Sequence, residues 1–163
     1  NKGLLQQMDT PQQLYDYPGN LFVAGFIGSP SMNFFDGKII RENGNLYTDL
    51  SSFRVKVPDN RKETYEKLID QEIIFGIRPE DIHNPEYAPP SIIADEVDVE
   101  VDVTELMGNE IFLYLINGDH NFVARVDPRT RVQMGDKMKV AFNVDNMHIF
   151  DPSEDPKNPI AVR

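Results

Sequence analysis

The sequence predicts a mainly β fold, a small barrel of antiparallel strands preceded by two short helices. The first indication is the strict alternation of Val97, Val99, Val101 and Val103 with acidic residues, which is typical of a half-buried strand. The second is the spacing of Asn-Gly turn signals between short apolar runs. The third is that most helix signals fall within the first 30 residues. Many short strands at turn spacing favour a barrel.

The two helices are predicted near the N-terminus by their capping residues. Thr10 is a good N-cap and is followed by Pro11, which suits the first helical position. Asn20 caps a second segment, residues 21–27, which is apolar almost all round and closed by Gly28. Because a helix without a polar face must be covered, we expect part of its cover to lie outside this chain.

The rest of the chain reads as strands and turns, with one later helix expected over residues 59–70. The expected strands cover residues 34–40, 46–50, 53–57, 73–75, 97–103, 111–116, 122–126, 138–144, 147–150 and 160–162.

Composition limits the classes of function. The 163 residues carry a net charge of −11 and include no cysteine. The negative charge disfavours nucleic-acid backbones and anionic membranes, and the lack of cysteine excludes disulfides and thiolate catalysis. No apolar run is long enough for a membrane span and the first residues lack a signal-peptide pattern, so we expect the fragment to be soluble.

One short stretch, Gly76-Ile77-Arg78-Pro79-Glu80-Asp81, organises the middle of the chain. It follows an apolar run, and Gly76 and Pro79 mark a change of direction. Pro79 suits the start of a helical turn. Glu80 and Asp81 would lie in that first turn, where the positive end of the helix dipole favours negative charge. The physics of this stretch predicts a structural corner in which Arg78 pairs with a neighbouring carboxylate.

The sequence shows no catalytic, cofactor-binding or metal-binding constellation. Residues 25–29 lack the spacing and the lysine of a phosphate-binding loop. His83, His120 and His148 lie far apart. Acidic residues at positions 96, 98, 100 and 102 share a strand face, but same-face neighbours stand roughly 7 Å apart, so a solvated face is the better interpretation.

Several motifs together resemble a known family. Residues 9–34 look like the segment that joins the ATPase domain of carbohydrate-importer ABC subunits (maltose, multiple-sugar and glycerol-3-phosphate types) to their C-terminal regulatory domain, and the later motifs are similar to those of the same family. The motifs that carry the resemblance are residues 10–15, 18–24, 26–34, Gly76–Asp81, 105–110, 135–137 and 148–151, in order and over nearly the whole chain.

The resemblance implies an OB-like barrel of the TOBE/MOI type, as one unit or as two intertwined OB-like units. Residues 1–30 would be the tail of the ATPase domain with its connecting helices, and residues 31–163 the regulatory domain. ATP and magnesium would bind to the ATPase part, so this fragment would hold no cofactor and would not be an enzyme. The implied partners are a second copy, the parent's ATPase domain, the permease subunits and, in some members, a regulatory protein. The implied location is the cytoplasmic face of the membrane. Nucleic acid is not expected as a partner.

The resemblance and the corner together select six candidate residues for an interface between copies or for locking the barrel. They are Asn33, Phe34, Arg78, Glu80, Asp81 and Phe150. Two other functions remain open: a barrel that senses a small ligand, either a sugar or an oxyanion, and an OB-type nucleic-acid binder. The first is disfavoured because no basic cluster lines any predicted strand pair. The second would need a basic groove with exposed aromatic residues.

Overall fold

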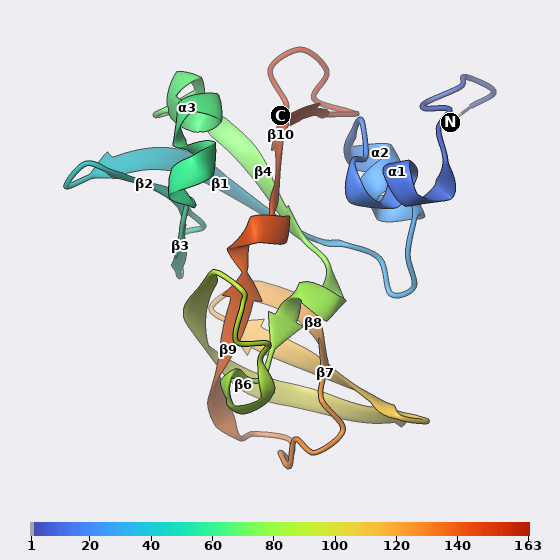
Figure 1. The fold of residues 1–163 in the computed structure, drawn as a ribbon, viewed down its shortest axis with the longest axis vertical. Helices are drawn as coiled ribbons and strands as arrows, with labels where there is room; N and C mark the ends of the chain where they lie inside the picture. The colour runs from blue at the N-terminus through green and yellow to red at the C-terminus, as the bar shows by residue number, and fades with distance from the viewer. Residues whose placement is uncertain (1) are drawn as a thin grey trace.

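The fold consists of two antiparallel sheets stacked end to end, with two short helices beside the upper sheet (Figure 1). The computed structural model describes residues 2–163. The first sheet has the strand order β11-β10-β4-β1-β2-β3 and the second has the order β5-β9-β6-β7-β8. In the second sheet β8 also lies beside β5, so the five strands curve towards a closed barrel.

The strands of the first sheet come from both ends of the chain. They are β1 (Asn33–Glu42), β2 (Asn45–Asp49), β3 (Arg54–Lys56), β4 (Glu72–Ile77), β10 (His148–Asp151) and β11 (Ile160–Val162). The strands of the second sheet are β5 (Ile82–His83), β6 (Ala94–Met107), β7 (Glu110–Asn117), β8 (His120–Val126) and β9 (Lys137–Asn143). The mainly β fold with short N-terminal helices is confirmed.

The chain crosses between the sheets at two 3-10 turns. η3 (Pro79–Asp81) leads from β4 into β5, and η5 (Val144–Asn146) leads from β9 back into β10. A third turn, η4 (Pro85–Tyr87), follows β5. The two-residue strand β5 was not predicted, because two residues are too few to show a periodicity.

The N-terminal helices begin where their caps predict. In α1 (Pro11–Asp16) the Thr10 hydroxyl accepts a hydrogen bond from the Gln13 amide at 3.3 Å. In α2 (Leu21–Phe26) the Asn20 side chain accepts from the Val23 amide at 3.0 Å. Both contacts satisfy an amide that has no partner within the helix.

The helix expected over residues 59–70 is present in part, as a helical run that ends at Leu68 and is not one regular α-helix. It consists of η1 (Asp59–Arg61), the four-residue α3 (Lys62–Tyr65) and η2 (Glu66–Leu68). Tyr65 and Leu68 are buried in the core, and the Asp70 amide then donates to the Ile39 carbonyl at 2.8 Å. The run therefore ends where the chain begins to pair with β1.

The sequence predicts that the alternating valines of β6 share one buried face, but not all of them face inward. Val97, Val99 and Val101 are buried, whereas Val103 is 39% exposed. A β-bulge between Val101 and Val103 shifts the register against β7, and this moves Val103 to the other face. The β6–β7 hairpin then continues well past the barrel, at the lower right of Figure 1.

One hydrophobic core joins the two sheets, with Phe35 of β1 near its centre. Four phenylalanine rings lie with their centroids between 5.3 and 6.5 Å from that of Phe35: Phe53, Phe75, Phe122 and Phe142. A smaller cluster of Ala24, Met32 and Phe150 packs α2 against the first sheet. Within residues 2–163, no helix combines the length and the apolar character needed to cross a membrane.

Candidate functional site

The corner at Gly76–Asp81 lies where the first sheet, α2 and the crossing to the second sheet meet. Gly76 pairs with Phe34 of β1 on one side and with His148 of β10 on the other. A Cβ atom at Gly76 would lie 2.7 Å from the Met32 sulfur and 3.0 Å from a ring carbon of Phe150. The glycine is therefore required by the packing of the smaller cluster beneath α2.

Arg78 is buried, with 3% of its surface exposed, and it holds the N-terminal segment. Its Nη1 donates to the Ile27 carbonyl at 2.7 Å, and its Nη2 donates to the Tyr15 carbonyl at 2.8 Å. The guanidinium carbon also lies 3.8 Å from the centre of the Tyr15 ring, a cation–π geometry. Gly28 has φ +118°, and a Cβ there would lie 3.0 Å from Arg78 Nη1.

The predicted local ion pair at the corner is wrong. Among residues 2–163, Arg78 forms no ion pair with Glu80 or Asp81. Asp81 instead accepts hydrogen bonds from the side-chain amides of Asn146, at 2.6 Å, and Asn143, at 3.4 Å. The carboxylate thus ties η3 to η5, the two crossings between the sheets.

Burial governs the ionisation of the corner. Desolvation raises the pKa of Asp81, against the lowering effect of its asparagine hydrogen bonds. Desolvation likewise raises the pKa of Glu80, which is half-buried, and lowers the pKa of Arg78. No nucleophile or base with a matching geometry accompanies these groups, so the corner has the features of a structural junction.

The other three candidate residues also contact their own domain. The Asn33 side chain bonds the Val123 backbone twice, donating to the carbonyl at 2.8 Å and accepting from the amide at 2.9 Å, which links β1 to β8. Phe150 is fully buried, and the Phe34 ring packs on its edge with a centroid distance of 5.9 Å. Phe34 keeps 37% of its surface exposed.

Backbone hydrogen bonds attach the N-terminal segment to the edge of the first sheet. The Leu21 amide donates to the Pro159 carbonyl at 2.9 Å, and the Ala161 amide donates to the Gly19 carbonyl at 3.0 Å. Gln6 accepts a bond from the Asn158 side chain at 2.7 Å. Residues 6–27 are therefore joined to β11, to its preceding loop and to Arg78.

A group of positive side chains surrounds His148 at the same junction. Arg61 donates to the Met147 carbonyl at 2.6 Å and to the Asp145 carbonyl, and Arg163 donates to the Tyr17 carbonyl. Burial lowers the pKa of His148 to about 4, helped by the charges of Arg78, Arg61 and Arg163. The sequence analysis missed this group because its members are spread over about a hundred residues.

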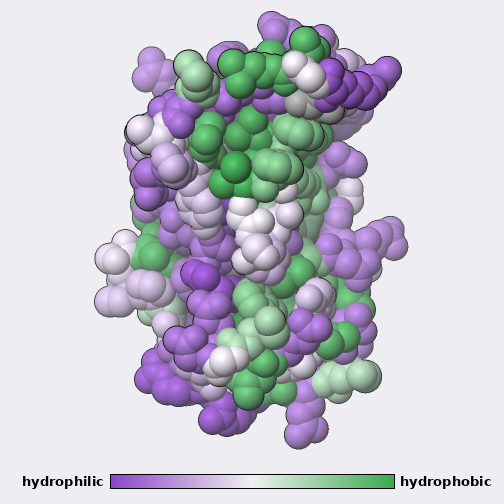
Figure 2. Space-filling view, turned by 90° about the vertical axis from the view of Figure 1, so that its right-hand side faces the viewer, coloured by the Kyte–Doolittle hydropathy of each residue, from purple (hydrophilic) through white to green (hydrophobic). Residues whose placement is uncertain are grey.

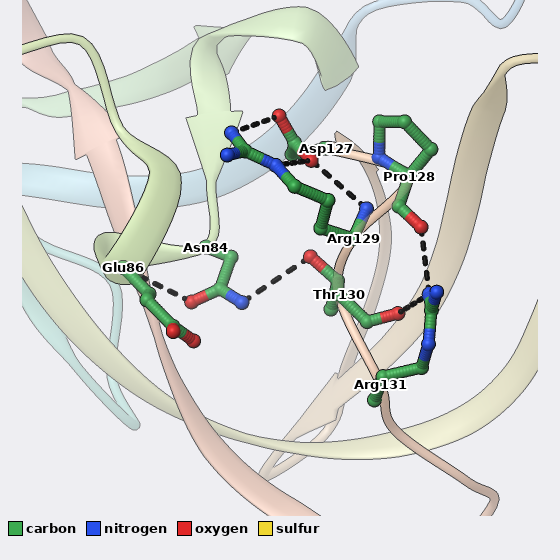
Figure 3. Close-up of polar contacts among 7 residues, drawn as sticks. All are labelled: Asn84, Glu86, Asp127, Pro128, Arg129, Thr130 and Arg131. Atoms are coloured by element: carbon green, nitrogen blue, oxygen red, sulfur yellow. Dashed lines mark hydrogen bonds and ion pairs between the residues drawn. The ribbon is translucent and has the colours of Figure 1, made fainter.

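A different arrangement is found where the loop after β8 meets β5 and η4 (Figure 3). Arg129 donates to both carboxylate oxygens of Asp127, at 2.8 and 2.9 Å. Asn84 donates to the Thr130 hydroxyl at 3.2 Å, which joins the loop to the start of η4. This arginine is exposed and ion-paired, unlike the buried Arg78.

Large apolar side chains are exposed in several parts of the molecule, among them α2 and the β6–β7 hairpin. On α2 they include Phe26, which is 74% exposed and stacked on Phe22 with a centroid distance of 5.8 Å. On the β6–β7 hairpin they include Leu106, 70% exposed, and Met107. Figure 2 shows the face that lies to the right in Figure 1, with hydrophobic surface both near the top and in the lower half.

Comparison with known families divides the chain into two overlapping parts. Residues 28–82 match the family described as the MalK OB fold domain, and residues 75–150 match the TOBE domain. The overlap, residues 75–82, contains the corner from Gly76 to Asp81. By structure, the chain resembles the cytoplasmic molybdate-binding protein ModG over 72% of its own length and 94% of that chain. The TM-score is 0.52 with 10% identical residues, so this similarity concerns the fold alone.

The curated relatives are longer proteins of one kind. The chain is 40% identical to the oligosaccharides import ATP-binding protein MsmX of Bacillus subtilis and 42% identical to the multiple sugar-binding transport ATP-binding protein MsmK of Streptococcus mutans. It is 39% identical to the trehalose/maltose import ATP-binding protein MalK of Thermococcus litoralis. These matches cover 91 to 93% of the chain but only 39 to 41% of the relatives. The chain belongs to the MalK-type OB and TOBE domains, the C-terminal regulatory part of sugar-importer ATP-binding proteins.

Proposed function

We propose that this chain is the regulatory and dimerisation domain of the ATP-binding subunit of a carbohydrate importer of the ABC type. The observation that carries the proposal is the match over 91% of the chain to proteins named as sugar import ATP-binding proteins. The division expected from the sequence, with residues 1–30 as the tail of an ATPase domain and its connecting helices and residues 31–163 as the regulatory domain, is part of this proposal.

The parent protein, on this proposal, hydrolyses ATP to drive carbohydrate uptake. ATP and magnesium would bind outside the present residues, so the isolated chain needs no cofactor. An ATP-hydrolysis assay on the purified chain tests this point directly. We expect no turnover above the buffer background, and turnover that rises in proportion to the protein concentration would contradict the proposal.

Self-association is supported by the exposed apolar side chains. Phe26 at the end of α2 and Leu106 on the β6–β7 hairpin are among the large apolar groups open to solvent, and burying such surface is the main driving force for association. Sedimentation of the chain at increasing concentration should show a dimer, and a strict monomer up to high micromolar concentration would contradict dimerisation.

Charge substitutions then decide which surface forms the dimer. Leu106→Asp on the hairpin and Phe26→Asp beside α2 each place a charge on one apolar surface. The variant that abolishes the dimer while its circular dichroism remains native identifies the interface. If both variants dimerise like the wild type, neither surface carries the contact.

The six candidate residues divide between the two roles on this proposal. Asn33, Arg78, Asp81 and Phe150 lock the domain, which is supported by their buried contacts within the chain. Phe34 and Glu80 keep part of their surface open and remain candidates for contact with a second copy.

The partners follow from the parent protein. We propose that the parent sits at the cytoplasmic face of the membrane, beneath the permease subunits, and that a regulatory protein docks on this domain in some settings. Nucleic acid is not proposed as a partner, because the net charge of −11 repels a phosphate backbone. A filter-binding assay at low salt tests this exclusion.

The alternative function, a barrel that senses a small ligand, now has an observation in its favour. The arginines around His148 form the basic cluster that the sequence analysis did not find. Calorimetry with sugars, sugar phosphates and oxyanions distinguishes this function from a purely structural domain.

A further inference from the structure

The eight arginines of this acidic chain divide into two groups by their partners. Four form ion pairs with carboxylates: Arg41, Arg54, Arg125 and Arg129. Among residues 2–163, the other four have no carboxylate in ion-pair contact, and three of these, Arg61, Arg78 and Arg163, lie around His148. In a chain with 27 acidic residues, three arginines without an ion-paired carboxylate thus lie together.

Two of these arginines line a cavity of about 250 Å³ between the N-terminal segment and the first sheet. Its polar wall contains Arg61, Arg163, His148 and Thr64, and its apolar wall contains Ile149 and Val162. Pockets for drug-sized ligands begin at roughly 300 Å³, so only a small molecule fits.

Both arginines keep hydrogen-bond donors that the protein does not use. A guanidinium group has five N–H donors. Arg163 makes one hydrogen bond, to the Tyr17 carbonyl, and Arg61 makes at most three, to Tyr65, Met147 and Asp145. The remaining donors are suited to the oxygens of a phosphate or a carboxylate.

We propose that this cavity binds the phosphate or carboxylate group of a small organic anion, with Arg61 and Arg163 donating to its oxygens. The apolar wall of Ile149 and Val162 would receive the carbon part of the ligand. Because the cavity is built from one chain, the site does not depend on the dimer proposed above.

The carboxylates near the site are placed on its rim or on its far side. Asp16 borders the cavity, is exposed, and accepts a hydrogen bond from Gln12 at 2.7 Å. Asp81 and Asp145 line the neighbouring cavity on the Arg78 side, not this one. Burial holds the His148 imidazole neutral at physiological pH, so its ring can accept or donate a hydrogen bond without adding a charge.

The test is a titration of the whole chain with small anions, followed by NMR of the His148 ring. The probes are inorganic phosphate, succinate and glucose 6-phosphate, with glucose as the neutral control. We expect a saturable shift of the His148 signals with at least one anion, no shift with glucose, and weaker binding as sodium chloride is raised. Saturation by phosphate alone identifies a phosphate ligand, and saturation by succinate alone identifies a carboxylate.

A pair of matched variants separates this site from general electrostatics. Arg163→Gln removes a lining charge and should weaken binding by about tenfold, the effect of losing one charge-assisted hydrogen bond. Arg131→Gln removes an exposed arginine that also lacks a carboxylate partner but lies outside the cavity, and it should leave binding unchanged. The proposal is overturned if no anion gives a saturable shift at millimolar concentration, or if both variants bind like the wild type.

Discussion

Arg78 and Arg129 make their contacts in opposite ways. Arg78 is buried, bonds two backbone carbonyls and lies on a tyrosine ring. Arg129 is exposed and forms a bidentate ion pair with Asp127 two residues away (Figure 3). Its guanidinium carbon also lies 4.3 Å from the centre of the Tyr87 ring. Removal of a buried charged donor leaves buried acceptors without partners, whereas exposed ion pairs contribute little. The fold should therefore depend on the contacts of Arg78 and not on the ion pair between Arg129 and Asp127.

The largest effect is expected from Arg78→Ala. The substitution leaves the Tyr15 and Ile27 carbonyls without a donor and should lower the free energy of unfolding by about 3 kcal/mol. Urea denaturation measures this change. Arg78→Lys keeps the charge but lacks the planar fork that reaches both carbonyls, so it should recover only part of the loss. A wild-type unfolding curve for Arg78→Ala would contradict the account.

A smaller loss of folding stability is expected from Gly76→Ala at the same corner. The new Cβ would meet the Met32 sulfur at 2.7 Å and the Phe150 ring at 3.0 Å, and overpacking of this kind costs about 2 kcal/mol. Gly25→Ala in α2 is the matched control, since its nearest neighbour is the part-exposed Phe34 ring at 3.3 Å and alanine favours a helix. Thermal unfolding should separate the two variants, and equal melting temperatures would show that the corner tolerates the methyl group.

The pH dependence of stability should show the half-buried His148. Its pKa is about 4 in the folded chain against 6.5 ordinarily, so the unfolded state binds the extra proton first as the pH falls. Stability attributable to this residue is therefore full above pH 6.5 and is lost as the pH falls towards 4, by at most about 3 kcal/mol.

The difference between the wild type and His148→Gln isolates this contribution. Asp81 and Glu80 have raised pKa values and act in the opposite direction, since their protonation favours the folded state as the pH falls. Both proteins contain these carboxyl groups, so their effect cancels in the difference. If the stability of the wild type and that of His148→Gln change with pH in the same way, the neutral imidazole in the folded chain is contradicted.

The smallest effect on folding stability is expected from a substitution of Arg129. Arg129→Ala removes the ion pair with Asp127, whose pKa that arginine lowers to about 2. Because both side chains are accessible to solvent, we expect no measurable change in stability at neutral pH. Urea denaturation at low and high salt checks this, and a loss as large as that of Arg78→Ala would reverse the comparison.

The sequence was informative wherever a structure depends on near neighbours. The caps of α1 and α2 and most strands were predicted because Thr10, Asn20 and the alternating residues act within a few positions. The helix over residues 59–70 was predicted too long and too regular, because its end depends on the Asp70 amide bonding to the Ile39 carbonyl, a partner distant in sequence. The inward position of Val103 failed because a bulge leaves no clear mark in the alternation.

The corner shows the same limit for the candidate site. The sequence located Arg78, but it assigned the side chain to nearby carboxylates. The true acceptors, Ile27 and Tyr15, lie 51 and 63 residues away. Backbone carbonyls carry no sequence signature, so such partners cannot be found from the pattern. The cavity between Arg61 and Arg163 depends on even longer separations and could be found only in the folded chain.

The central claim is that Arg78 joins residues 6–27 to the first sheet as one unit, and amide hydrogen exchange tests it most directly. The Leu21 and Ala161 amides bond across this junction. In the wild type, both should exchange as slowly as amides in the centre of β4. In Arg78→Ala, both should exchange much faster, while amides of β7 change only by the global loss of stability. Fast exchange of the Leu21 and Ala161 amides in the wild type would contradict the claim. So would a variant in which the ratio of their exchange rates to those of the β7 amides is the same as in the wild type.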